Sequence, residues 1–311
     1  MTLAARDELE HLRLAAEVAA LEHVEVVLPD EHHVALGGMR LHYLDWGSAG
    51  GPPGRSSVLF LHGGGLTART WDLVCLALRT SFHCIALDQR GHGDSEWSPG
   101  LDYGTAAHVG DLEALIAHLG LDRPVLVGQS MGALNALTYA ERHAAALGGL
   151  VLVDMTPDVR FDGTKRIFDF VTAPAELDSV EEFVERAMEF NPQRDPRLLR
   201  RSLLHNLRQL PNGKWTWKYD RRHMTRERFD ALRDQVGHLW ELVGTVTCPT
   251  LVVRGERSDV VAPESAQALA EALPDGESIT VPDAGHTVQG DNPRALAAVL
   301  ERFLRRIRPQ A

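Results

Sequence analysis

A serine at the centre of residues 128–132, which read Gly-Gln-Ser-Met-Gly, is the strongest candidate for a reacting group in this sequence. The apolar residues 124–127 before it predict a short buried strand, and residues 133–143 after it predict a helix. A Gly-x-Ser-x-Gly at a strand-to-helix junction forms a sharp turn that lifts the serine hydroxyl above the sheet edge, where it can attack a carbonyl carbon. The pattern therefore predicts Ser130 as a catalytic nucleophile.

A nucleophilic serine needs a base, and His286 is the best placed of the 15 histidines. It follows the last predicted strand, 278–281, in a loop that can bring an imidazole over the serine. Imidazole suits this role because it exchanges a proton near neutral pH. We expect His286 to take the proton of Ser130.

A carboxylate should orient that imidazole by accepting a hydrogen bond from one ring nitrogen, which fixes the tautomer. We favour Asp259, because it follows the penultimate predicted strand, 250–253. Two alternatives stay open. Asp154 ends an earlier predicted strand and could also reach the site, although a structural hydrogen bond at the sheet edge explains it too. Glu256 shares the loop of Asp259.

Backbone N–H groups should stabilise the oxyanion that forms during attack on a carbonyl. One should come from Met131, the residue after the nucleophile, and the other from the glycine-rich loop 62–65. Glycines suit this loop because its backbone must approach a substrate oxygen closely. Within the loop Gly64 is the preferred donor and Gly63 the alternative, while His62 should hold the shape of the loop. The charged segment 88–95 leaves a strand through two glycines, and we interpret it as a structural turn.

Substrate contacts are expected from residues around the serine and from aromatic residues later in the chain. We expect these contacts from Gly63, Gln129, Trp215 and Trp217. Most aromatic side chains of residues 156–246 should pack inside that segment, and some should line an apolar pocket. Its basic residues could bind a substrate carboxylate or simply lie at the surface: Lys165, Arg166, Arg221 and Arg222.

Strands alternate with helices along most of the sequence, which predicts an α/β fold with a mostly parallel sheet. The predicted strands are continuous apolar runs, as expected for a sheet buried on both faces; they are 58–61, 84–87, 124–127, 149–153, 250–253 and 278–281, with predicted helices near 70–78 and 105–119. An antiparallel meander is predicted before them, at 24–28, 32–36 and 39–46.

The alternation stops between residues 156 and 246, where helical stretches are predicted at 180–190, 196–210 and 226–243. A helical block inside an α/β series is best explained as a cap inserted above the sheet. We therefore predict an N-terminal helix at 1–23, a core formed by 24–155 and 247–311, and a helical cap at 156–246.

Composition limits the classes of partner. The chain has 311 residues, 44% of them hydrophobic, and a formal net charge of −11, which disfavours nucleic acid and anionic membranes as partners. The charged N-terminal helix does not resemble a signal peptide and no long apolar run occurs, so we expect a cytoplasmic protein. We also expect it to be a monomer or homodimer. Three scattered cysteines predict neither a disulfide framework nor a metal site, and no motif for a nucleotide or redox cofactor is present.

Taken together, these motifs resemble the α/β-hydrolase superfamily over nearly the whole chain. The matching segments are 62–65, 88–95, 128–132, 255–259 and 283–286. The resemblance implies a mostly parallel central sheet flanked by helices, with a helical cap inserted after the sixth strand. It also implies Ser130, Asp259 and His286 as the triad, with Gly64 and Met131 as oxyanion donors.

The nucleophile narrows the reactions that the resemblance implies. Epoxide hydrolases and haloalkane dehalogenases of this superfamily carry Asp where this chain has Ser130. The expected activity is hydrolysis of carboxylic esters or lactones of small to medium apolar substrates through an acyl-enzyme, without a cofactor. One alternative is a carbon–carbon bond hydrolase of aromatic ring-cleavage products, a group that usually has Asn where this chain has Gln129. The other is a non-catalytic ligand receptor on the same fold.

Overall fold

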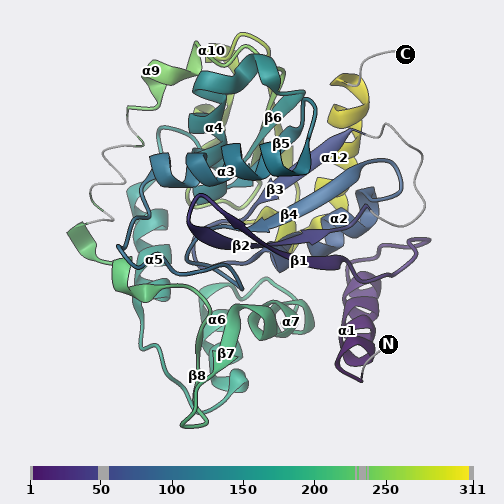
Figure 1. Cartoon of the computed structure of the whole chain (residues 1–311), viewed down its shortest axis with the longest axis vertical. Coiled ribbons are helices and arrows are strands. Elements are labelled where there is room, and N and C mark those ends of the chain that lie inside the picture. The colour runs from purple at the N-terminus through teal and green to yellow at the C-terminus, as the bar shows by residue number, and fades with distance from the viewer. Residues whose placement is uncertain (1–2, 48–55, 228–229, 231–235, 237, 308–311) are drawn as a thin grey trace.

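An eight-stranded sheet forms the centre of the protein (Figure 1). The computed structural model describes residues 3–47, 56–227, 230, 236 and 238–307. In spatial order the strands are β1 (Asp30–Leu36), β2 (Met39–Asp45), β4 (His83–Asp88), β3 (Ser57–Leu61), β5 (Val125–Gln129), β6 (Gly149–Val153), β9 (Thr250–Gly255) and β10 (Gly276–Val281). β1 and β2 pair antiparallel, as do β2 and β4, and the pairs from β4 to β10 are parallel. The carboxyl ends of β3, β5, β6, β9 and β10 therefore lie along one edge of the sheet.

Helices cover both faces of this sheet (Figure 1). One face packs against α3 (Thr105–Leu119), α4 (Met131–His143) and α10 (Pro263–Ala272). The other packs against α1 (Leu3–Val18), α2 (Asp72–Leu78) and α12 (Pro293–Ile307). Successive residues of β5 point to opposite faces, and Leu126 and Val127 are both fully buried because each face has its own helical layer. This arrangement confirms the predicted α/β fold.

The helical insertion after β6 is also present. It contains α5 (Phe161–Thr172), α6 (Val180–Phe190) and α7 (Pro196–Asn206), a short hairpin of β7 (Leu207–Gln209) and β8 (Trp215–Trp217), a 3-10 turn at Arg221–His223 and α9 (Trp240–Val243). Local signals fix where its helices begin: the Ser179 side chain accepts a hydrogen bond from Glu182 N before α6, and Asp195 accepts one from Arg197 N before α7. The insertion has a small core of its own, centred on Phe183 and Trp217. We call residues 156–246 the cap.

Four predicted elements differ from the structure. The N-terminal helix, predicted at 1–23, ends at Val18 in α1. Residues 24–28 form no strand. Their apolar side chains are half-buried against the hydrophobic core between the sheet and helices α2 and α12, so packing rather than strand pairing accounts for their apolar character. The helix predicted at 196–210 ends at Asn206, because the chain turns into β7 and pairs with β8. The helix predicted at 226–243 lies partly outside the described residues, and α9 covers its end.

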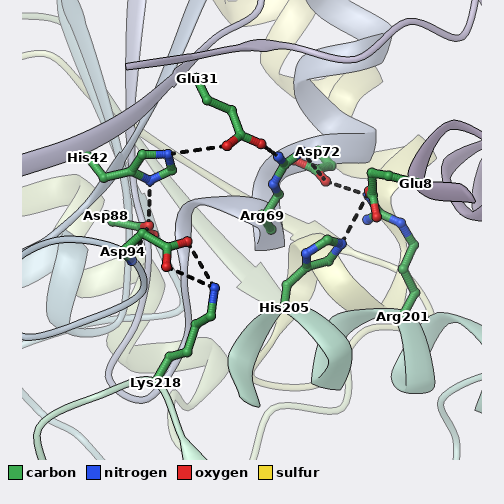
Figure 2. Close-up of polar contacts among 10 residues, drawn as sticks. All are labelled: Glu8, Glu31, His42, Arg69, Asp72, Asp88, Asp94, Arg201, His205 and Lys218. Carbon is green, nitrogen blue, oxygen red and sulfur yellow. Dashed lines mark hydrogen bonds and ion pairs between the residues drawn. The ribbon is translucent and has the colours of Figure 1, made fainter. Parts of the chain in front are cut away.

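Polar contacts fasten the cap to the core (Figure 2). Lys218 Nζ of the cap lies 2.9 Å from Asp94 Oδ2 of the core. On α7, Arg201 Nη2 lies 2.6 Å from Asp72 Oδ2 and 2.5 Å from Glu8 Oε1 of α1, and His205 Nε2 lies 3.2 Å from the same Glu8 oxygen. The N-terminal helix thus contacts both the core and the cap.

Two further features concern the class of protein. All three cysteines are buried free thiols. Among the described helices, none combines the length and the apolar character needed to cross a bilayer.

Candidate active site

Ser130 occupies the turn between β5 and α4 in a backbone conformation that residues other than glycine rarely adopt, with φ of 51° and ψ of −115°. Backbone from neighbouring segments closes around the turn. A Cβ on Gly128 would lie 2.3 Å from the carbonyl oxygen of Gly132, and a Cβ on Gly132 would lie 2.3 Å from that of Leu61. Only glycine fits at these two positions, which is why the motif has its spacing.

The two residues expected to donate to the oxyanion, Met131 and Gly64, both line the cavity that contains Ser130. Met131 is the first residue of α4, so its N–H has no acceptor within the helix. Gly64 lines the same cavity as Ser130. Both candidate oxyanion donors are therefore on the wall that carries the serine.

The glycine-rich loop is held in shape by His62, as expected. Its Nδ1 contacts Gly63 O at 2.8 Å and its Nε2 accepts a hydrogen bond from Gln89 N at 3.0 Å, while the Gln89 side chain donates to His62 O and accepts from Asn135. Complete burial lowers the pKa of His62. We infer a neutral ring that supports the loop.

His286 follows β10 and lies on the rim of the same cavity as Ser130. Its Nδ1 lies 2.8 Å from Asp154 Oδ2, so the Nδ1–H group donates a hydrogen bond to this carboxylate and Nε2 carries the lone pair. In this conformation the Gln129 amide nitrogen lies 3.2 Å from that Nε2 and donates to His286 O at 3.1 Å. The imidazole is thus held by a carboxylate on one side and by the residue before the serine on the other.

Asp154 is a fully buried carboxylate at the end of β6. Besides the imidazole, it accepts hydrogen bonds from Gly255 N at 3.0 Å and from Ser258 Oγ at 2.6 Å. The Ser258 hydroxyl also accepts from the amides of Val260 and Val261. The loops after β6 and β9 are therefore joined around this carboxylate.

The prediction that Asp259 orients the imidazole is therefore wrong. The Asp259 side chain is 41% exposed and pairs with Arg166 of the cap, with 2.6 Å between Oδ2 and Nη1. Glu256, the other alternative, accepts a hydrogen bond from Asp283 N. In the loop after β9, Ser258 points toward Asp154 and Asp259 points toward the cap. Because β6 pairs directly with β5, Asp154 lies beside the turn that carries Ser130.

A cavity of about 790 Å³ separates the sheet edge from the cap. Of the residues predicted to contact substrate, Gly63, Gln129 and Trp217 line this cavity, whereas Trp215 packs in the cap core. A Cβ on Gly63 would lie 2.1 Å from the Gln129 side-chain oxygen, so this glycine provides room for Gln129. Much of the remaining wall is apolar: Leu134, Met155, Val159, Ile167, Phe168, Phe170, Val171 and Phe190.

Two polar groups missed by the sequence analysis contribute to this region. Ser258 joins the two loops around Asp154, and Arg194 of the cap lines the cavity. Neither belongs to a spacing pattern that a single sequence reveals, because their positions depend on how separate loops meet.

Two groups of side chains outside the cavity bring potential metal ligands within 4.8 Å of one another (Figure 2): Glu8, Asp72 and His205, and His42, Asp88 and Asp94. In the first, Arg201 pairs with both carboxylates, and Arg69 Nη1 lies 3.7 Å from Asp72 Oδ2. In the second, the buried Asp88 accepts from His42 Nδ1 and from the amides of Ala68 and Asp94. Burial alone would raise the pKa of Asp88, but the hydrogen bond and charge of His42, the charge of His62 and the Ala68 amide lower it to about 2. Both groups therefore have structural partners, in line with the expected structural role of segment 88–95.

The order of the elements and the serine turn agree with the comparison to known proteins. The sequence profile of the alpha/beta hydrolase family matches residues 58–299. The chain belongs to the alpha/beta hydrolase family. Esterase Rv0045c from Mycobacterium tuberculosis is 31% identical over 303 residues, which cover 95% of this chain and 96% of that protein. Its crystal structure matches with a TM-score of 0.73 over 94% of this chain and 96% of that chain.

Other relatives of this alpha/beta hydrolase carry different names. N-formylmaleamate deformylase from Pseudomonas putida is 30% identical over 272 residues, covering 88% of this chain and 95% of that protein. A crystal structure of E-2-(acetamidomethylene)succinate hydrolase matches with a TM-score of 0.76 at 24% identity, over 89% of this chain and 99% of that chain, and supports the fold alone. The family is thus established, and the relatives include an esterase and a deformylase.

Proposed function

We propose that this alpha/beta hydrolase is a serine esterase that acts on carboxylic esters of small or medium size through an acyl-enzyme. The single observation that carries the proposal is the contact between His286 Nδ1 and the buried Asp154 carboxylate, beside a serine held in a strained turn. A serine, an imidazole and a carboxylate in this order are the groups that acyl transfer needs.

In the proposed reaction, Ser130 Oγ attacks the ester carbonyl while His286 Nε2 takes its proton. Asp154 keeps the proton on Nδ1 and stabilises the imidazolium that forms. The amides of Gly64 and Met131 donate to the oxyanion. His286 then protonates the leaving alcohol, and a water molecule, activated by the same imidazole, releases the acid from Ser130.

The Gln129 amide must share the imidazole with the serine. Its nitrogen lies 3.2 Å from the Nε2 lone pair, which is the lone pair that must receive the serine proton. We infer that Gln129 holds the ring in place before substrate binds and yields Nε2 to Ser130 during the reaction. Its side-chain oxygen is buried without a hydrogen-bond partner in the described structure, so a small rotation of the amide breaks no contact of that oxygen.

The wall of the cavity supports an apolar acyl or alcohol group in the substrate. The name of the esterase at 31% identity supports ester hydrolysis as well. The proposal comprises the assignment of the triad residues, the division of the chain into core and cap, and a small ester as the substrate.

Replacement of the serine tests it. Ser130→Ala should reduce kcat/KM for p-nitrophenyl acetate and butyrate by a factor on the order of 10⁴ or more, because the covalent route is lost. The far-UV circular dichroism spectrum and melting temperature should stay close to those of the wild type. Full ester hydrolysis by Ser130→Ala would refute the proposal. A wild type that releases p-nitrophenol only once per chain would support a ligand receptor instead.

A further inference from the structure

The cationic side chains that line the cavity differ in how they are paired. Arg166 binds Asp259 and donates to Phe190 O, and Arg257 pairs with Asp283. The charges of both are therefore balanced by the protein itself.

Arg194 lines the same cavity but has no such partner. Across the described part of the chain, no carboxylate oxygen lies within 4.0 Å of its guanidinium, and its Nε is buried without an acceptor. Burial lowers the pKa of Arg194, and only the charge of Asp291 opposes this effect. The group remains a cation whose desolvation is poorly compensated.

The guanidinium is nevertheless fixed in position. It packs on the backbone of α11 (Val288–Asp291), where a Cβ on Gly290 would lie 2.6 Å from Nη2. The Arg194 amide donates to Asn191 O at 3.3 Å, and Asn191 Nδ2 in turn donates to Asp291 at 3.1 Å. Arg194 thus packs against α11, the helix that directly follows the loop carrying His286.

The nearby acid, Asp291, accepts hydrogen bonds from other groups and forms no ion pair with Arg194. Asp291 accepts from Gly285 N at 2.9 Å and from Asn191, so its oxygens face other donors. The basic residues that the sequence offered as carboxylate ligands are engaged within the cap or with the core: Lys165 with Asp169, Arg166 with Asp259, Arg221 with the carbonyls of Thr172 and Ala173, and Arg222 with Asp220.

We propose that Arg194 binds a carboxylate group of the substrate, so that the preferred substrates are esters that also carry a free carboxylate. This inference rests on the proposed function, because it names the substrate class of the same cavity. A planar guanidinium presents paired N–H donors that match the two oxygens of a carboxylate. A single guanidinium carries one positive charge, which suits a carboxylate better than a doubly charged phosphate.

Paired substrates separate the charge from the size of the acyl group. The mono-p-nitrophenyl esters of succinic, glutaric and adipic acid are compared with their carboxamide analogues, which have nearly the same shape and no charge. The wild type should prefer the carboxylate at one or more of the three chain lengths. In Arg194→Gln, kcat/KM for the preferred carboxylate ester should fall by about tenfold to a hundredfold, the usual effect of losing a charged hydrogen-bond partner. The matching carboxamide should change by less than about threefold.

A neighbouring arginine provides the control. Arg197 belongs to the same cap segment, is 60% exposed and pairs with Asp195 outside the cavity lining. Arg197→Gln removes the same charge and should leave the carboxylate-to-carboxamide ratio unchanged. A wild type without preference at every chain length, or an Arg194→Gln variant that loses both substrates equally, would overturn the inference.

Binding without turnover distinguishes this inference from the proposed function. Dicarboxylates of the three chain lengths should bind to Ser130→Ala in calorimetry, and the additional change Arg194→Gln should abolish that binding while Arg194→Lys retains part of it. If Ser130→Ala kept its ester hydrolysis, the proposed function would fail, yet the binding result would still decide the role of Arg194. Dicarboxylate binding that is equal with and without Arg194 would overturn the inference alone.

Discussion

The contact between His286 and Asp154 determines which acid can serve the imidazole. A carboxylate that is fully buried and also held by Gly255 N and Ser258 Oγ cannot turn away from the ring. Asp259 lies in the neighbouring loop but is 41% exposed and paired with Arg166. The two aspartates therefore differ in both contact and environment.

This difference predicts opposite outcomes for two isosteric changes. Asp154→Asn should lower kcat/KM for a p-nitrophenyl ester by a factor on the order of 10³ to 10⁴, because an amide no longer fixes the productive tautomer of His286. Asp259→Asn should change it by less than about fivefold, since an exposed ion pair is worth little. Steady-state kinetics on both variants, with melting temperatures as a folding check, decide the matter. The reverse ranking would show that Asp259 is the acid in solution.

The placement of Ser130 in a strand-to-helix turn was predictable because its signal is local in the sequence, while its role as nucleophile stays a prediction. Ser130 was recognisable because its turn, its strand and its helix are consecutive. The choice between Asp154 and Asp259 was not, because both follow buried strands and only the path of the loop after β9 separates them. Arg194 was missed for a related reason: whether an arginine is free depends on the partners of every acid around it.

At the scale of elements, the strand–turn–helix unit formed by β5 and α4 positions Ser130, the proposed nucleophile. Its backbone segments approach so closely that Gly128 would place a Cβ 2.3 Å from a carbonyl oxygen. That oxygen belongs to backbone at the start of α4, so it cannot rotate away as a side chain would. The geometry of the turn and the packing of the helix are therefore linked.

A methyl group at Gly128 should therefore damage stability and activity together. Gly128→Ala should lower the free energy of unfolding by about 2 kcal/mol or more, because the backbone must shift, and should reduce esterase activity by at least about tenfold. Gly110→Ala is the control, since Gly110 is exposed in α3 with no atom within 4 Å of the added Cβ. It should leave activity unchanged and stabilise the protein by up to about 1 kcal/mol. Urea unfolding measures the stability of both variants, and ester hydrolysis measures their activity. Equal effects of the two substitutions would contradict the close contact at Gly128.

Elements with their own periodic signal matched the prediction, including α3 and α6 at their predicted bounds. Residues 24–28 did not, because an apolar segment that packs on a core resembles an edge strand in sequence. The helix predicted at 196–210 also ran into the hairpin of β7 and β8. The pairing of this hairpin depends on two strands of three residues each, which is too short for a periodic pattern.

At the scale of the molecule, the N-terminal helix contacts the core, and through Glu8 it also contacts the cap (Figure 2). Leu12 of α1 is fully buried against the core, and Glu8 on the same helix contacts Arg201 and His205 of the cap. Burial alone would raise the pKa of Glu8, but the contact with His205 and the charges of Arg201 and Arg69 lower it from 4.5 to about 2.

The lowered pKa predicts how this link responds to acid. Because the folded protein holds the Glu8 proton more weakly than the unfolded chain does, the stabilisation is complete above the unfolded pKa of 4.5 and is lost as the pH falls toward about 2. Glu8→Gln should cost about 2–3 kcal/mol of unfolding free energy at pH 7 and clearly less at pH 3.5.

The same helix offers a matched comparison for this prediction. Glu10 is 75% exposed and faces Arg13 at 3.7 Å. Glu10→Gln should cost less than about 0.5 kcal/mol at both pH values. Urea unfolding at pH 7 and pH 3.5 gives the comparison, and a Glu8→Gln cost that is independent of pH would rule out the ionised contact.

The most direct measurement is covalent labelling of the nucleophile. An organophosphonate probe should add to the wild-type protein as a single adduct in intact-mass spectra, and peptide mapping should locate it on Ser130. The adduct should be absent in Ser130→Ala and should form far more slowly in His286→Ala, because the imidazole activates the hydroxyl. An unlabelled wild type, or an adduct on another serine such as Ser95 or Ser258, would contradict the assignment of Ser130 as the nucleophile.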